Sequence, residues 1–158
     1  MSFAQTFSGG GGSIITLVDT SRFNIAVSGL ASNINYHFGL ESVTINITHT
    51  QDRDIDCYLA APDGTRIELT TDNGGTGDNY TNTTFRHDAS QSISSGSAPF
   101  NGTYAPEQNL WGVNNGQNGN GTWQLRVIDD SNNGITGSVV SWSITFGNNP
   151  AHPFIFDE

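Results

Sequence analysis

The chain has 158 residues, which is enough for one domain with a sizeable core and short for two. Five basic residues stand against fifteen acidic ones, for a net charge of −10, so binding to nucleic acid or to an anionic membrane surface is excluded for lack of clustered cations. A single cysteine, Cys57, excludes an internal disulfide and a cysteine-built zinc site.

The composition predicts an all-β domain. The chain contains 19 glycines and only 13% charged residues, and apolar residues nowhere recur at helical spacing over three turns. Many short strands joined by turns are typical of a sandwich or barrel. No run of apolar residues is long enough to cross a membrane, so we expect no membrane insertion. A secretion signal, if the protein has one, is expected outside these 158 residues.

Taken in chain order, residues 1–13 have the composition of a linker or a disordered N-terminus, since they end in a run of four glycines flanked by serine. Residues 14–147 are expected to form the β-sandwich, and residues 148–158 a C-terminal tail. Within the sandwich, two-residue alternation and apolar runs predict strands at 14–18, 23–27, 40–50, 53–59, 66–69, 84–89, 121–128 and 139–146.

Two connections have distinct sequence signals. Residues 61–65, Ala-Pro-Asp-Gly-Thr, are a turn signal that predicts a hairpin between the strands on either side. Residues 129–134, Asp-Asp-Ser-Asn-Asn-Gly, have similar turn chemistry and predict that the last two strands return on one another. Residues 71–84 are polar and lack a period, which indicates a long loop. Trp123 and Trp142 fall on the apolar faces of the last two strands and are expected in the core, as is Cys57.

No catalytic residues are expected. The chain lacks a Gly-X-Ser-X-Gly elbow, a His-Glu-X-X-His pair, a Walker loop and a dinucleotide fingerprint. The four histidines are scattered without a partner motif. The chain alone is therefore not expected to be an enzyme.

Carboxylates provide one binding hypothesis. Asp52, Asp54 and Asp56 have the alternate spacing of a calcium loop, but Cys57 occupies the position of the essential glycine, which excludes an EF-hand. On a strand the same spacing places all three carboxylates on one solvent-facing side, where they repel unless a cation neutralises them. Calcium is thus one interpretation, and solvated turn residues are the other. The expected calcium ligands are Asp54, Asp56, Asp88, Asp129 and Asp130.

Aromatic side chains provide the alternative binding hypothesis. Rings on exposed loops can stack against sugars, and with the two core tryptophans set aside, Trp111, Tyr80 and Tyr104 are the expected contacts. On this interpretation the domain binds a carbohydrate or another cell-surface ligand.

Four segments, in the right order, resemble the P domain (Homo B domain) of subtilisin-like proprotein convertases and bacterial secreted proteases. The closest resemblance is at the C-terminal end, where Gly-Thr-Trp-Gln-Leu-Arg-Val is followed by Asp-Asp, a glycine and Ser-Trp-Ser-Ile-Thr-Phe. The matching segments are 54–65, 85–89, 100–107 and 121–146.

This resemblance implies a jelly-roll-like, galactose-binding-like β-sandwich without catalytic residues. Such a domain follows the catalytic domain of a secreted serine protease in the same chain and supports its folding, stability, docking and response to calcium or pH. An extracellular or cell-surface location is implied. The sequence departs from the family in two places: the Arg-Gly-Asp of mammalian convertases is missing before Ile55, which indicates a bacterial-type domain, and Arg86-His87 replace an expected acidic residue, which weakens a metal site at that loop.

Overall fold

The computed structural model describes residues 3–16 and 19–153. Within these residues there are nine strands and three short 3-10 helices, and no helix is long and apolar enough to cross a membrane. In chain order the elements are β1 (Gln5–Ser13), β2 (Thr20–Val27), β3 (Gly39–His49), η1 (Asp52–Asp54), β4 (Ile55–Ala60), β5 (Arg66–Thr71), β6 (Tyr80–Arg86), η2 (Ile93–Ser95), β7 (Thr103–Tyr104), η3 (Leu110–Val113), β8 (Gly121–Asp129) and β9 (Gly137–Gly147).

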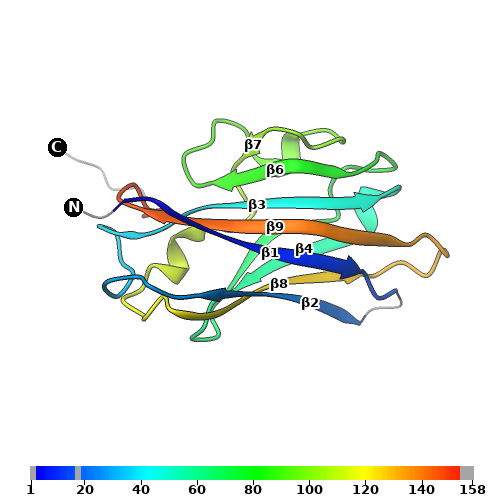
Figure 1. Cartoon of the computed structure of the whole chain (residues 1–158). Helices are drawn as coiled ribbons and strands as arrows, with labels where there is room; N and C mark the ends of the chain where they lie inside the picture. Colours follow the sequence, from blue (N-terminus) through cyan, green and yellow to red (C-terminus); the bar gives the residue numbers. More distant parts are fainter. Residues whose placement is uncertain (1–2, 17–18, 154–158) are drawn as a thin grey trace.

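The strands form two sheets that pack face to face (Figure 1). One sheet has the order β1-β9-β3-β6-β7, and the other has the order β2-β8-β4-β5. Several consecutive strands alternate between the sheets, so the chain wraps around a shared core in the manner of a jelly roll. The expected all-β sandwich is confirmed.

The two-residue period of the sequence corresponds to burial in the structure. On β8 the side chains of Trp123, Leu125 and Val127 are fully buried, while the residues between them are partly exposed. Trp142 on β9 is 1% exposed, and Trp123 packs edge-on against Phe146. Cys57 is also buried, which raises the pKa of its thiol, so the expected core positions of both tryptophans and of the cysteine are confirmed.

The expected pairing of the last two strands is wrong. β8 pairs with β2 and β4, whereas β9 pairs with β1 and β3 in the other sheet. The connection at 130–136 therefore crosses from one sheet to the other. Alternation shows which face of a strand is buried, but both sheets bury the same kind of face, so the pattern does not reveal which sheet a strand joins.

The expected hairpin at 61–65 is confirmed, because β4 and β5 pair directly and Gly64 adopts a positive φ of 91° in the turn. The expected loop at 71–84 is shorter, since β5 extends to Thr71 and β6 starts at Tyr80. β6 itself ends at Arg86 rather than continuing to Ala89. Its polar residues Thr81 and Asn82 face solvent and conceal the strand period.

The expectation of a linker over residues 1–13 is also wrong, because Gln5–Ser13 form an edge strand paired with β9 along its length. The glycine run has a structural reason. A Cβ at Gly9 would lie 2.7 Å from Ile25 Cγ1 and 2.9 Å from the carbonyl oxygen of Asn24 on β2. The missing side chains allow β1 to approach β2 closely and to cover the open side between the two sheets (Figure 1).

The first part of the expected tail packs on the domain. Ala151 is fully buried, and its N–H donates to the carbonyl of Leu40 at 2.9 Å. The Asn114 amide donates to the carbonyl of Ala151, also at 2.9 Å. Residues 154–158, and residues 17–18 of the expected strand at 14–18, lie outside the described residues.

The structural role of the glycine run can be tested with one matched pair of substitutions. A Cβ at Gly11 would overlap the backbone carbonyl of Val139, whereas a Cβ at Gly10 has no atom within 4 Å. We expect Gly11→Ala to lower the free energy of unfolding in urea by about 2 kcal/mol and Gly10→Ala to change it by less than about 0.5 kcal/mol. Equal effects of the two substitutions would contradict this role for β1.

Candidate functional site

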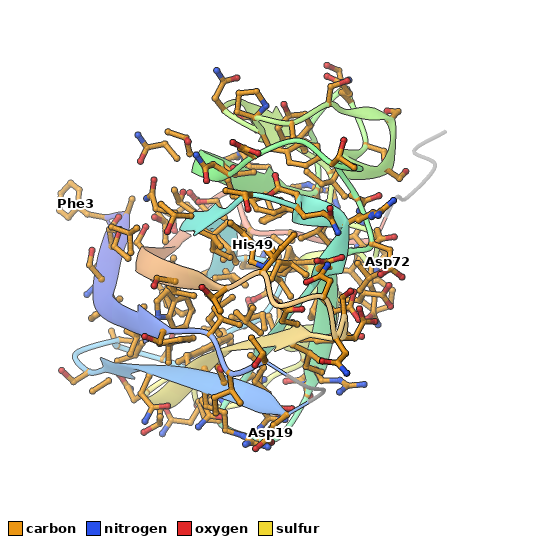
Figure 2. All side chains as sticks on the ribbon, turned by 90° about the vertical axis from the view of Figure 1, so that its right-hand side faces the viewer. Phe3, Asp19, His49 and Asp72 are labelled. Carbon is orange, nitrogen blue, oxygen red and sulfur yellow. The ribbon has the colours of Figure 1, made fainter. Side chains whose placement is uncertain are left out.

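Four chain segments meet at one end of the sandwich. β3 ends there at His49 and β8 at Asp129, while η1 leads into β4 and the loop after β5 carries Asp72. Figure 2 looks onto this end, with His49 near the middle between the two sheets and Asp72 toward the periphery. The acidic residues at this end form two groups with different environments.

The first group is a buried network built around His49. The N–H of Gln51 donates to His49 Nδ1 at 3.1 Å, and a backbone N–H can only donate, so the ring proton lies on Nε2. Nε2 then donates to Asp129 Oδ2 at 3.0 Å, and both side chains are fully buried. Asp129 Oδ1 accepts a further bond from the N–H of Ser131 at 3.2 Å.

Asp54 belongs to the same group and is also buried, at 4% exposure. The Gln51 amide donates to both of its oxygens at 3.2 Å, and the Asn133 amide donates to Oδ2 at 2.7 Å. Its expected solvent-facing position is wrong, because η1 turns the chain before β4 begins at Ile55. Ligand atoms of His49, Asp54 and Asp129 lie within 4.8 Å of one another, but each already has a protein partner, so a metal ion would have to displace these bonds.

The second group is Asp56, Asp72 and Asp130, whose oxygens also lie within 4.8 Å of one another. Here the carboxylates are not neutralised: among the described residues the only ion pairs are His49–Asp129 and Arg86–Asp88. Oδ1 of Asp56 is buried and has no hydrogen-bond partner within residues 3–16 and 19–153.

The electrostatics of the second group follow from this arrangement. Burial raises the pKa of Asp56 to about 7, and the charges of Asp72 and Asp130 add to the increase. The pKa of Asp130 is also raised, first by burial and then by Asp72 and Asp54. Three carboxylate oxygens within 4.8 Å of one another and without a paired cation suit a hard divalent ion, which prefers carboxylate and carbonyl ligands.

A further buried acid, Asp52, lies beneath the loop at 72–79. Its Oδ1 accepts from the N–H of Asn79 at 2.9 Å, and its Oδ2 is buried without a partner. Burial raises the pKa of Asp52 to about 7, and the charge of Asp78 adds to this. Gly74, at φ 92°, covers the side chain closely, since a Cβ there would lie 2.7 Å from Asp52 Cβ.

Four of the five expected calcium ligands therefore gather at one end, but they divide between the two groups. Asp88 is elsewhere: it accepts from Arg86 Nε at 3.0 Å, and Arg86 pairs with Ser42, seven residues before His49 on β3. At about 3.3 Å per residue along β3, Ser42 and its partner Arg86 lie about 23 Å from His49. His49 and Asp72 were missing from the expected set. Asp72 directly follows Thr71, the partner of Asp56 in the confirmed hairpin, and this adjacency was the available signal.

The expected sugar-binding aromatics do not form a platform. Tyr80 is 1% exposed and stacks on Phe100 with ring centroids 4.9 Å apart, and Tyr104 packs edge-on against the same ring. Only Trp111, on η3, is exposed, at 38%. The assignment of both tyrosines as ligand contacts is wrong, because β6 and β7 turn them into the core.

A shallow cavity of about 580 Å³ lies beside His49. Serine and threonine hydroxyls from 13–16, 48–50 and 136–138 line most of it, and His49 is its only titratable residue. Both ring nitrogens of His49 are already hydrogen-bonded, so the cavity has no free general base.

The difference between buried and exposed carboxylates can be tested with Asp129 and Asp88. Asp129→Ala leaves the Nε2–H of His49 buried without an acceptor, so we expect the free energy of unfolding to fall by about 3 kcal/mol. Asp88→Ala removes an exposed ion pair and should change it by less than about 1 kcal/mol. Urea denaturation measures both, and a loss at Asp129 no larger than at Asp88 would contradict the network.

Comparison with known proteins supports the resemblance seen in the sequence. The proprotein convertase P-domain profile matches residues 41–146. Leupeptin-inactivating enzyme 1 of Streptomyces exfoliatus is 31% identical over 122 residues, which cover 77% of this chain and 21% of that enzyme, so the chain spans about a fifth of this relative's length.

Two crystal structures of the Aeromonas sobria serine protease, one of them in complex with a chaperone, are 16% identical to the chain. They align with TM-scores of 0.45 and 0.46 over 93% and 94% of this chain and 28% of theirs. The P-domain profile, in contrast, covers most of the chain, and the chain therefore belongs to the proprotein convertase P-domain family.

Proposed function

We propose that the chain is the non-catalytic accessory domain of a larger, secreted subtilisin-like serine protease, in which it supports the folding and stability of the catalytic domain and docks against it. Membership of the P-domain family carries this proposal. The match covers 21% of leupeptin-inactivating enzyme 1, and this supports the proposal that the chain is one domain of a longer protein.

The geometry of the described residues agrees with a non-catalytic role. His49 is the only histidine among them that pairs with a carboxylate, and its Nδ1 is occupied by the N–H of Gln51. A catalytic histidine needs a ring nitrogen that is free to accept the proton of a nucleophile. His49 therefore holds chain segments together and does not act as a base.

The parent protein tests the accessory role. Deletion of residues 1–158 should lower the yield of active protease several-fold, because small losses of stability reduce the amount of folded enzyme. The kcat/KM of the remaining enzyme, normalised by active-site titration, should stay unchanged. An unchanged yield, or a loss confined to kcat/KM, would contradict a folding and stability role.

For the second acidic group, we propose a Ca²⁺ site formed by Asp56, Asp72 and Asp130. The orphaned, buried Oδ1 of Asp56 is the observation that supports it, because such an atom requires a partner. A divalent cation would offset the repulsion among three neighbouring carboxylates and would join β4, the loop after β5 and the connection after β8. Backbone carbonyls and water supply the remaining ligands that calcium requires.

Calcium should raise the melting temperature, and the increase should depend on pH. Without metal, the pKa of Asp56 rises from 3.8 to about 7 on folding, so the folded state binds more protons between about pH 4 and pH 7, and this group reduces stability as the pH rises through that window. Calcium binds only the ionised form. Scanning calorimetry should show an increase of about 4 °C at ten times the Kd at pH 8, and a smaller one at pH 5.5.

Matched variants assign this calcium effect to the site. Asp130→Asn and Asp72→Asn should abolish the increase, and Asp88→Asn should preserve it. A melting temperature that is the same in calcium and in chelator would remove the calcium proposal, and it would leave the accessory role in the protease untouched.

A further inference from the structure

A pair of histidines meets at the opposite end of the domain from the acidic groups. His87 directly follows β6, and His152 belongs to the segment after β9. Their ring centroids are 4.9 Å apart, with the ring planes at 60°. In Figure 1 both β6 and β9 end on the left, where the C-terminal segment leaves the sandwich.

The backbone holds these two rings in place. The bonds of Ala151 to Leu40 and Asn114 fix the residue just before His152. The N–H of Asn149 also donates to a carboxylate oxygen of Glu41 at 2.8 Å. Because β6 is paired with β3, the strand that carries Leu40, His87 and His152 are anchored to the same sheet.

Among the residues that the structure describes, each ring has one nitrogen with no hydrogen-bond partner. His152 Nδ1 lies 2.8 Å from the carbonyl of Pro153, and a carbonyl only accepts, so the proton is on Nδ1 and Nε2 keeps its lone pair. This is the second-sphere bond that orients metal-binding histidines in many sites. His87 Nδ1 is buried and has no hydrogen-bond partner.

The surroundings of His87 favour its neutral, metal-binding form, chiefly because the ring is partly buried. Burial lowers the pKa of His87, Asp88 raises it, and His152 and Arg86 lower it. Asp88 itself is hydrogen-bonded to Arg86.

The distance between the two ring centroids is the one expected when both imidazoles bind the same metal ion. When two imidazoles bind one tetrahedral ion through nitrogens at about 2 Å, their ring centres lie about 5 Å apart. Imidazole nitrogen selects borderline divalent transition metals, whereas Ca²⁺ and Mg²⁺ select oxygen.

We propose that His87 Nδ1 and His152 Nε2 bind one Zn²⁺ or Ni²⁺ ion, which fastens the C-terminal segment to the end of β6. Water completes the coordination. This site is separate from the proposed calcium site, because His87 follows Arg86, which pairs near the start of β3, whereas the acidic groups lie where β3 ends.

The test uses the complete chain without a histidine tag, in 5 mM CaCl₂ and in an Asp56→Asn background so that the acidic group does not take up the added metal. Zn²⁺ or Ni²⁺ at ten times the Kd should raise the melting temperature by about 4 °C at pH 7.5. The increase should disappear at pH 5, where protons compete for the imidazoles. Imidazole ¹⁵N spectra should show shifts of His87 Nδ1 and His152 Nε2.

The matched variants are His87→Gln, His152→Gln and, as a control, His37→Gln, since His37 is exposed and distant in the chain from both. The first two should lose the increase, and the control should keep it. An increase that persists in either variant, or ¹⁵N signals of His87 and His152 that do not respond to the metal, would overturn the proposal whatever the outcome for calcium.

Discussion

The structure depends on one buried hydrogen bond between His49 and Asp129. His49 ends β3 in one sheet and Asp129 ends β8 in the other, so this bond joins the two layers where the hydrophobic core ends. A buried carboxylate is tolerated only when its oxygens have donors, and here the imidazole and the N–H of Ser131 provide them. Asp54 continues the network through Gln51 and Asn133, and its own carbonyl accepts from the N–H of Asp130. The network thereby fixes the chain on both sides of the connection between the sheets.

The carboxylates at this end of the domain therefore have two roles: some are held by hydrogen bonds within the protein, and others remain available to bind a cation. Asp129 and Asp54 are satisfied by protein donors, while the next residue along, Asp130, is held beside Asp56 and Asp72 without a counter-charge. The network thus positions the proposed cation site without belonging to it. Such a division suits the proposed accessory domain of a secreted protease, because calcium at Asp56, Asp72 and Asp130 would then stabilise the domain while the sheets stay joined without it.

The sequence predicts the strands and the core well because alternation reports directly on burial. The sequence does not predict features that depend on contacts between residues far apart in the chain. The period of β8 and β9 does not distinguish the two sheets, and glycines have no side chain with which to show a period, so β1 resembled a linker. The same limit applies to the sites. Asp88 has a suitable carboxylate, but it follows β6 at the opposite end of the domain from the acidic groups. Asp72 lies beside Asp56 only because β4 pairs with β5. Tyr80 looked like a loop residue because its polar neighbours conceal β6.

On the proposal made above, the cation binds Asp56, Asp72 and Asp130 and leaves the bond between His49 and Asp129 intact. A crystal structure grown at pH 8 with calcium tests it most directly, through anomalous difference density. We expect one peak with oxygens of Asp56, Asp72 and Asp130 at about 2.3–2.6 Å and an unchanged bond between His49 and Asp129. A peak between His49, Asp54 and Asp129, with that bond broken, would contradict the account.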